Sequence, residues 1–446
     1  MGDTTSQVHF TTPKRTIATE RTEPPVGQMP TSIPTIDLSL ASSPHTRPTL
    51  LTSLRHALLN IGFLYISNHG ISTSIIQDLL DTLPPLFSLS DEVKKSAALV
   101  HSPHFLGYSS FGHETTAGQR DQREQFEFAN EGYLIGGRKS GAGEKEKGGP
   151  GDVPLELRLL GPNQWPEIYG DREAKLRDEG LGRLRETVKA YIVALQDLAD
   201  RFLDLVEEAL EVKPGVLKGF TGPQDRLKLV HYRSSSPPPS QNGSTANKRN
   251  GEDGYIQGVG PHKDSSGWMT FLLQTQPSPP LSSSSSIPST TSPNPTQING
   301  RGLQVLTKTG SWIDVSPIPS TFVVNMGQAF EVVTNGLCKA TTHRVLLPTG
   351  GFERYSVPFF QGVRPVLTKK EFMTLWEEFE ARRERWEREG MVGKESEEGM
   401  KVDSPFLRGK YETWGEAQLR TKIRSHRDVG RRWHGDVFER YVNDNG

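Results

Sequence analysis

The chain has 446 residues, of which 33% are hydrophobic, and it contains 44 Gly and 32 Pro residues. This excess of Gly and Pro indicates long loops around one sizeable core. The 52 Lys and Arg residues balance the 53 Asp and Glu residues, for a net charge of −1. The sequence therefore lacks the basic excess of a nucleic-acid binder, and a small-molecule substrate is favoured.

A single cysteine, Cys338, excludes an intrachain disulfide and a cysteine-based zinc cluster, and it fits a reducing compartment. The first ten residues lack the apolar region of a secretory signal. No run of the sequence is long and apolar enough to cross a bilayer. We therefore expect a cytoplasmic protein with no membrane or nucleic-acid partner and no evident obligate protein partner.

The N-terminal part of the chain is predicted to combine helices and strands. Residues 1–30 are polar and are predicted to be a disordered arm. Residues 31–175 are predicted to form an α/β region, in which a helix through Leu51–Leu59 precedes a buried strand at Ile61–Ile66. A low-complexity insertion, rich in Gly, Lys and Glu, interrupts this region at residues 136–151.

A long helix is predicted from Leu181 to about Val212. Apolar residues recur there in alternating steps of four and three, which is a heptad seam. The seam consists of Leu184, Val188, Tyr191, Leu195, Leu198, Phe202 and Leu205. Such a seam is compatible with a dimerising coiled coil, but for one segment of this kind a helix packed against a sheet is the commoner structure.

Short β-rich runs follow the long helix, and they predict a sandwich or barrel within residues 176–368. The predicted strands are 227–232, 268–274, 302–306, 321–326, 343–347 and 355–360. Two insertions, at residues 234–254 and 277–299, are rich in Ser, Pro, Asn and Gly. They cannot bury enough apolar surface to offset the entropy of ordering, so we expect surface loops.

After residue 368 the sequence becomes highly charged and helical in its pattern. Phe372, Trp376 and Phe379 recur at helical spacing and are the expected packing face. Residues 369–446 are therefore predicted to form a charged helical C-terminal extension.

Two histidines and one aspartate have the spacing of a metal site. His262 and Asp264 are two positions apart, so their side chains share one side of an extended segment. With His343 they would place two imidazoles and one carboxylate on one face of an octahedral iron(II), which leaves three positions open. A second His-x-Asp motif, His434 to Asp436, is followed by no further histidine and serves as an internal control.

Arg354 comes eleven positions after His343, and Ser356 follows two positions later. If these residues lie on neighbouring strands, the guanidinium of Arg354 can bind a carboxylate in a bidentate manner. Ser356 shares the same face of its strand and can add a hydrogen bond. A ligand that spans from the metal to Arg354 therefore needs a distal carboxylate, as 2-oxoglutarate has.

Together these motifs resemble the isopenicillin N synthase-like family of iron(II)/2-oxoglutarate-dependent dioxygenases. The resemblance covers most of the chain outside the arm and insertions. It includes the segments Ile33–Leu38, Gly62–Gly70, Asp121–Phe126, Gly161–Pro166, Leu227–Tyr232, His262–Gln274, Gly302–Leu306, Asn325–Gly327 and Arg354–Ser356. The interval between Asp264 and His343 is longer than this family usually shows, and the insertion at 277–299 accounts for the excess.

The resemblance implies a mainly β fold with flanking helices, in which a distorted double-stranded β-helix, or jelly-roll, is backed by the long helix. It implies that Tyr232 reaches the distal carboxylate of the cosubstrate. It also implies an enzyme that uses Fe(II), 2-oxoglutarate and O2, with ascorbate as an optional reductant. Such an enzyme releases succinate and CO2 while it hydroxylates, desaturates or closes a ring in a small organic metabolite, as in secondary metabolism.

Aromatic residues near the motifs are the expected substrate-binding residues: Phe111, Phe126, Phe128, Trp268 and Phe360. Three alternatives stay open. The first is an oxidase of the same fold in which Arg354 and Ser356 hold the substrate's own carboxylate. The second is a cupin-type metalloenzyme, and the third is a non-catalytic jelly-roll binding protein.

Overall fold

The structure is a computed structural model. It describes residues 32–116, 119–131, 134–135, 138–139, 153–168, 180–233, 256–277, 302–347, 353–393, 402 and 404–444. The predicted arm at 1–30 and the predicted insertion at 234–254 lie outside these residues, as do most of the predicted insertions at 136–151 and 277–299.

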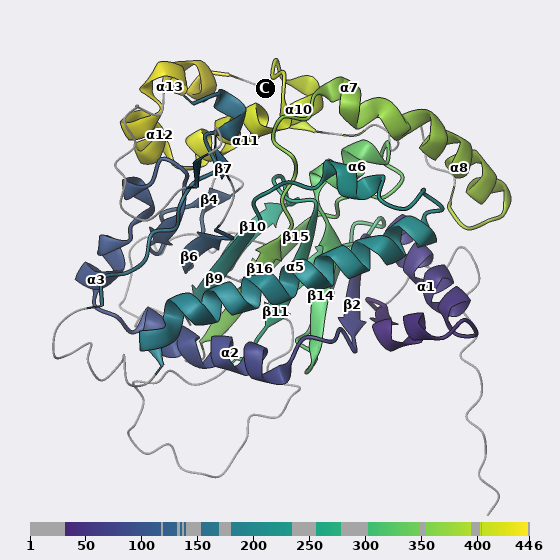
Figure 1. Ribbon diagram of the computed structural model, residues 1–446, viewed down its shortest axis with the longest axis horizontal. Coiled ribbons are helices and arrows are strands. Elements are labelled where there is room, and N and C mark those ends of the chain that lie inside the picture. Colours follow the sequence, from purple (N-terminus) through teal and green to yellow (C-terminus); the bar gives the residue numbers. More distant parts are fainter. Residues whose placement is uncertain are drawn as a thin grey trace, which may run out of the picture.

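Two β-sheets form the centre of the structure (Figure 1). The larger sheet has, in spatial order, β1 (Thr35–Asp37), β2 (Phe63–Ser67), β14 (Thr321–Met326), β11 (Met269–Gln274), β16 (Arg354–Phe360), β9 (Arg226–Tyr232), β6 (Glu124–Ala129) and β3 (Gly107–Ser109). The smaller sheet has β10 (Gln257–His262), β15 (His343–Leu346), β12 (Leu303–Leu306) and β13 (Trp312–Asp314). Two short hairpins are β4–β5 (Thr115–Thr116 with Gln119–Arg120) and β7–β8 (Leu134–Ile135 with Arg138–Lys139).

The predicted strands agree with observed strands to within two residues at each end. In the two sheets, strands β1, β3, β6, β10 and β13 were not among the predicted strands. Strand β10 follows directly on an insertion and contains two Gly and a Pro. Within the larger sheet only β1 and β2 pair in parallel. That sheet contains strands from before and after residue 176, so it spans the boundary predicted there.

Helices cover the larger sheet and its edges. Their bounds are α1 (Arg47–Asn60), α2 (Thr73–Phe87), α3 (Asp91–Ser96), α5 (Leu184–Ala209), α6 (Gln328–Val333), α7 (Lys369–Phe372), α8 (Trp376–Arg388), α10 (Pro405–Arg408), α11 (Trp414–Ser425), α12 (Arg427–Trp433) and α13 (Gly435–Val442). Short 3₁₀ helices span Leu38–Ser42, Leu99–His101, Leu155–Leu157, Leu181–Arg183, Leu217–Phe220 and Met373–Leu375.

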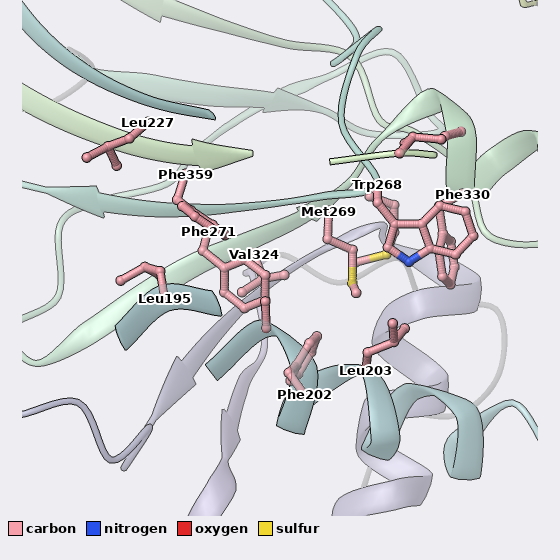
Figure 2. Close-up of a cluster of buried hydrophobic side chains, with 14 of the residues drawn as sticks. Leu195, Phe202, Leu203, Leu227, Trp268, Met269, Phe271, Val324, Phe330 and Phe359 are labelled. Carbon is pink, nitrogen blue, oxygen red and sulfur yellow. The ribbon is translucent and has the colours of Figure 1, made fainter. Parts of the chain in front are cut away.

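Helix α5 is the predicted long helix, and Figure 1 shows it running across the strands, with α1 and α2 alongside. All seven residues of its heptad seam are buried within this one chain. Figure 2 shows Phe202 of α5 and Phe271 of β11 in the resulting apolar layer, where their rings meet edge to face at 5.8 Å. The seam therefore packs the helix on the sheet. Truncating a buried Phe such as Phe202 to Ala costs about 3–5 kcal/mol.

The C-terminal part is helical, as predicted. Phe372 and Phe379 are buried, and Trp376 is partly buried and donates a hydrogen bond from Nε1 to the carbonyl of Val332 at 2.7 Å. Cys338 is also buried, so it is a small residue of the core. Within the described part of the chain, no helix has the length and apolar character needed to span a membrane.

Candidate active site

The three predicted metal ligands lie together at one edge of the smaller sheet. His262 ends β10 and His343 begins β15, and the antiparallel register places them opposite each other. Asp264 Oδ1 lies 3.8 Å from Nε2 of His262 and 3.6 Å from Nε2 of His343. Since all three ligand atoms are within 4.8 Å of one another, one cation can contact all of them.

Backbone carbonyls fix the orientation of both imidazoles. Nδ1 of His262 lies 2.8 Å from the carbonyl oxygen of Gly260, and Nδ1 of His343 lies 3.1 Å from that of Thr341. Because a carbonyl can only accept, each Nδ1 carries a proton, and Nε2 is the nitrogen available to a metal. Burial, with His343 beside it, lowers the pKa of His262 to about 3, so the ring is neutral and ready to bind a metal.

The carboxylate of Asp264 is held by its second oxygen. Oδ2 accepts hydrogen bonds from Thr270 Oγ1 at 2.6 Å and from Asn325 Nδ2 at 2.7 Å, which leaves Oδ1 toward the imidazoles. Burial alone would raise the pKa of Asp264, but the two histidines and these two hydrogen bonds outweigh it and lower the pKa. Two neutral imidazoles and one ionised carboxylate are a donor set that fits iron(II).

Arg354 begins β16 and is only 2% exposed. Its Nη2 donates a hydrogen bond to Gln274 Oε1, and its guanidinium carbon lies 5.6 Å from the ring centroid of Tyr232. Nη1 is buried and has no hydrogen-bond partner among the described residues. Burial lowers the pKa of Arg354, but an arginine stays charged in proteins. A buried cation with an unused donor fits a carboxylate ligand.

A cavity of about 230 Å³ connects these groups. Its lining includes all six residues expected to bind the metal or the cosubstrate, namely His262, Asp264, His343, Arg354, Ser356 and Tyr232. We call the part formed by these six residues the metal end. Residues of both sheets line the cavity, including Thr270 of β11 and Leu303 of β12.

Of the five aromatic residues expected at the substrate pocket, only Phe360 lines the cavity. Phe126 and Phe128 are fully buried on the other face of β6, where their rings stack at 6.0 Å. Since side chains alternate along a strand, Glu127 between them faces the cavity. The expectation for the two phenylalanines was therefore wrong by one position along the strand.

Trp268 and Phe111 also lie outside the cavity lining. Trp268 is fully buried in the apolar layer, where its ring lies 5.0 Å from that of Phe330 between centroids (Figure 2). The ring of Phe220 lies 5.7 Å away. Phe111 contacts the ring of His231 at 6.0 Å. Trp268 is a packing residue, because a large aromatic side chain next to a motif is as easily used by the core as by a pocket.

Sequence reasoning missed the other part of the cavity, which is lined by ionisable residues. We call this part the charged wall, and it consists of Glu114, Arg123, Glu127, Arg226, Lys228, Lys422 and His426. A signal was present at the start of β9, where Arg226 and Lys228 alternate with Leu227 and Leu229; Arg226 and Lys228 line the cavity together with Val230 and Tyr232. This period of two could have marked one polar face of the strand.

Ion pairs neutralise most of the charged wall. Glu127 is buried and accepts from Arg226 Nη1 at 2.6 Å and from Lys422 Nζ at 2.9 Å. Burial alone would raise the pKa of Glu127, but Lys422, Lys228 and Arg226 hold it well below its ordinary value. Burial lowers the pKa of Lys422 to about 8. Glu127 and Lys422 thus join the sheet to the C-terminal helix α11 as an ionised pair near neutral pH.

Helix α11 also reaches the metal end. Gln418 Nε2 donates a hydrogen bond of 2.9 Å to the carbonyl of Ser265, the residue after Asp264. The predicted C-terminal extension therefore forms one wall of the cavity and contacts the segment that carries Asp264, a predicted metal ligand.

Comparisons with known proteins agree with this site. Residues 33–168 match the family model described as "non-haem dioxygenase in morphine synthesis N-terminal". Residues 283–363 match the family model of the 2OG-Fe(II) oxygenase superfamily. The 2-oxoglutarate-dependent dioxygenase frbJ of Dothideomycetidae sp. is 35% identical over 405 residues, which are 90% of this chain and 92% of that protein. A 2-oxoglutarate-dependent dioxygenase of Gibberella zeae is 34% identical over 349 residues, 76% of each chain.

A solved structure shares the fold. A full-length Neurospora crassa protein, crystallised in complex with alpha-KG, has a TM-score of 0.55 at 19% sequence identity, and the similarity covers 87% of this chain and 95% of that chain. The chain belongs to the iron(II)/2-oxoglutarate-dependent dioxygenase family. The predicted enzyme class and the predicted use of Fe(II) and 2-oxoglutarate are confirmed, and the same-fold oxidase and binding-protein alternatives are disfavoured.

Proposed function

We propose that His262, Asp264 and His343 hold the iron of this dioxygenase, and that Arg354 and Ser356 bind the distal carboxylate of 2-oxoglutarate. The observation that carries the proposal is the pair of unused groups at the metal end. Asp264 Oδ1 points toward both imidazoles, and Arg354 Nη1 is buried with no partner among the described residues.

The two sheets supply a frame for this arrangement. The metal ligands are on or next to β10 and β15 of the smaller sheet, and Arg354 and Ser356 are on β16 of the larger one. We take the two sheets to be the two halves of a distorted double-stranded β-helix. Tyr232 pairs with Arg354 in the register of β9 and β16, so we assign its hydroxyl to the same carboxylate subsite.

The chain's own residues bind the metal and the cosubstrate, orient the metal ligands and enclose the reacting molecules in the cavity. When bound, iron(II) supplies the activation of dioxygen, coupled to oxidative decarboxylation of 2-oxoglutarate to succinate and CO2. Thr270 and Asn325 keep the Asp264 carboxylate in one orientation, and the carbonyls of Gly260 and Thr341 keep the imidazoles in one tautomer. We propose that a small organic molecule is hydroxylated, desaturated or cyclised in the same cavity.

Anaerobic calorimetry tests this function. Protein loaded with Fe(II) is titrated with 2-oxoglutarate, and the titration is repeated without metal. We expect one 2-oxoglutarate per chain, with tight binding that requires the metal, because the metal and Arg354 each hold one end of the ligand. Failure to bind 2-oxoglutarate, or equal binding with and without Fe(II), would refute the proposal.

A further inference from the structure

Lys228 is the cation of the charged wall with the least direct pairing. Its Nζ lies 3.7 Å from Glu127 Oε2 and 3.9 Å from Glu114 Oε1. Both distances exceed that of a hydrogen bond, and no hydrogen bond joins this ammonium to any residue in the described part of the chain. Its side chain is 15% exposed and lines the cavity. Lys228 therefore has donors available for a ligand.

The neighbouring carboxylates are already occupied by other donors. Glu127 accepts from Arg226 at 2.6 Å and from Lys422 at 2.9 and 3.0 Å. Glu114 accepts from Arg123 at 2.6 Å. A cationic ligand would have to compete for these oxygens, whereas an anionic ligand would meet an ammonium whose hydrogen-bonding capacity is unused.

The charges of the wall do not cancel. Four cations line it, Arg123, Arg226, Lys228 and Lys422, against two carboxylates, Glu114 and Glu127. A third carboxylate, Asp121, lies behind Arg123 at 3.2 Å. Four cations against three carboxylates leave one positive charge with His426 neutral. A ligand with a single negative charge would balance it, and burying a charge without balance is costly.

The cosubstrate is not suited to supply this negative charge. Lys228 and Tyr232 are both on β9 and four residues apart, and Tyr232 is paired with Arg354 on β16. A strand rises about 3.4 Å per residue, which puts roughly 14 Å between the two positions along β9. If Arg354 holds the distal carboxylate of 2-oxoglutarate, Lys228 faces a different part of the cavity.

We propose that Lys228 binds a carboxylate of the organic substrate, and that the substrate is therefore a small carboxylic acid. This inference rests on the proposed function. It assigns to the organic substrate the part of the cavity that the metal and 2-oxoglutarate leave free. In this arrangement Lys228 fixes the acid group at the charged wall, and the C–H bond to be oxidised extends toward the metal end.

The first test uses the full chain loaded with Fe(II) and 2-oxoglutarate without oxygen. The probes are aliphatic and aromatic carboxylic acids of about four to ten carbons, each paired with its primary amide, which has nearly the same shape without the charge. Binding is measured by calorimetry. We expect at least one acid to bind about tenfold or more tightly than its amide, since hydrogen bonds to charged groups are the stronger ones. If no acid binds more tightly than its amide, the inference is wrong.

Variants assign the effect to Lys228. We expect Lys228→Met to weaken binding of the preferred acid by about tenfold to a hundredfold and to leave binding of the amide and of 2-oxoglutarate unchanged. Lys228→Arg keeps the cation and should retain a preference for the acid. Lys218→Met is the matched control, because Lys218 is paired with Asp204 on the surface at 2.6 Å. Melting curves establish that each variant is folded.

The outcomes separate the two proposals. If the unmodified chain binds neither Fe(II) nor 2-oxoglutarate, the proposed function fails. If it binds both and Lys228→Met keeps the full preference for acids over amides, the proposed function stands and the assignment of Lys228 is wrong.

Discussion

The metal end and the charged wall line one cavity, but the chain builds them differently. At the metal end, His262 and Asp264 are two positions apart, and each ligand is oriented by a nearby carbonyl or strand side chain. In the charged wall, Glu127 of β6 is paired with Lys422 of α11, almost 300 positions further along the chain. A short motif thus places two of the three clustered residues at the metal end, whereas the charged wall depends on a contact between distant segments of the chain.

The largest effect is expected at the metal end. Replacing Asp264 by Ala removes the only carboxylate among the three clustered ligands, so iron binding and turnover should both be lost. Iron content after anaerobic dialysis and succinate formation are the measurements. Asp436→Ala is the control, since Asp436 belongs to the second His-x-Asp motif and pairs with Arg158 at 2.8 Å. If the Asp264 variant keeps full iron content and the control loses it, the ligand assignment is wrong.

The next largest effect is expected at Arg354. Arg354→Ala would leave the distal carboxylate of 2-oxoglutarate buried without its partner, which costs on the order of 3–5 kcal/mol. The Michaelis constant for 2-oxoglutarate should rise roughly a hundredfold to a few thousandfold, at about 1.4 kcal/mol per tenfold. Arg354→Lys keeps the charge but loses the planar guanidinium that can bind a carboxylate through two hydrogen bonds. Binding of 2-oxoglutarate should therefore be partly impaired in this variant.

Iron affinity, measured in parallel, should not change in either Arg354 variant. The opposite result is an unchanged Michaelis constant for 2-oxoglutarate together with weaker binding of the organic substrate. Arg354 would then bind the organic substrate, and the metal end and the charged wall would both be substrate-binding.

The charged wall should make the fold sensitive to acid through His426. Burial lowers the pKa of His426 to about 4, with Lys422 and Lys228 adding to burial and with Glu114 and Glu127 opposing it. The ordinary pKa is 6.5, so between pH 6.5 and pH 4 the unfolded chain takes up a proton that the folded chain does not. Stability is therefore present above pH 6.5 and falls by about 3 kcal/mol as the pH drops through this window.

Melting temperatures of the metal-free protein at pH 7 and pH 5 measure this loss. His426→Gln should lose less on acidification than the unmodified chain, because Gln does not titrate. The exposed His45 gives the matched control, His45→Gln, which should behave like the unmodified chain. The ring of His113 also contacts His426, at 5.7 Å, so His113→Gln checks that the effect belongs to His426. An equal loss in all four proteins would contradict the account.

The smallest effect concerns the contact between helix α11, which carries Lys422 of the charged wall, and Ser265, which follows Asp264 of the metal end. Gln418→Ala removes one hydrogen bond to the carbonyl of Ser265, so unfolding in urea should show a loss of about 1 kcal/mol. The exposed pair of Gln77 and Asp81 on α2 provides the control Gln77→Ala, with a change below about 0.5 kcal/mol. A loss no greater than in the control would mean that α11 is not held by this contact.

The sequence predicted residues that lie together at the metal end, because they occur at short spacing on strands or next to them. It also predicted most of the core strands and the position of α5, whose apolar residues recur regularly and are buried. It failed for Phe126 and Phe128, since one position along a strand decides which face a side chain occupies, and only the pairing of β6 fixes that face. Lys422 could not be placed, because nothing local to α11 indicates that it packs beside β6.

An experimental structure with Mn(II) and 2-oxoglutarate bound tests the central claim most directly. We predict one metal ion bonded to Nε2 of His262, Nε2 of His343 and Oδ1 of Asp264, with the distal carboxylate of 2-oxoglutarate on Nη1 of Arg354 and Lys228 free for a second ligand. A metal ion bound elsewhere, or the distal carboxylate of 2-oxoglutarate on Lys228, would contradict the division of the cavity into a metal end and a charged wall.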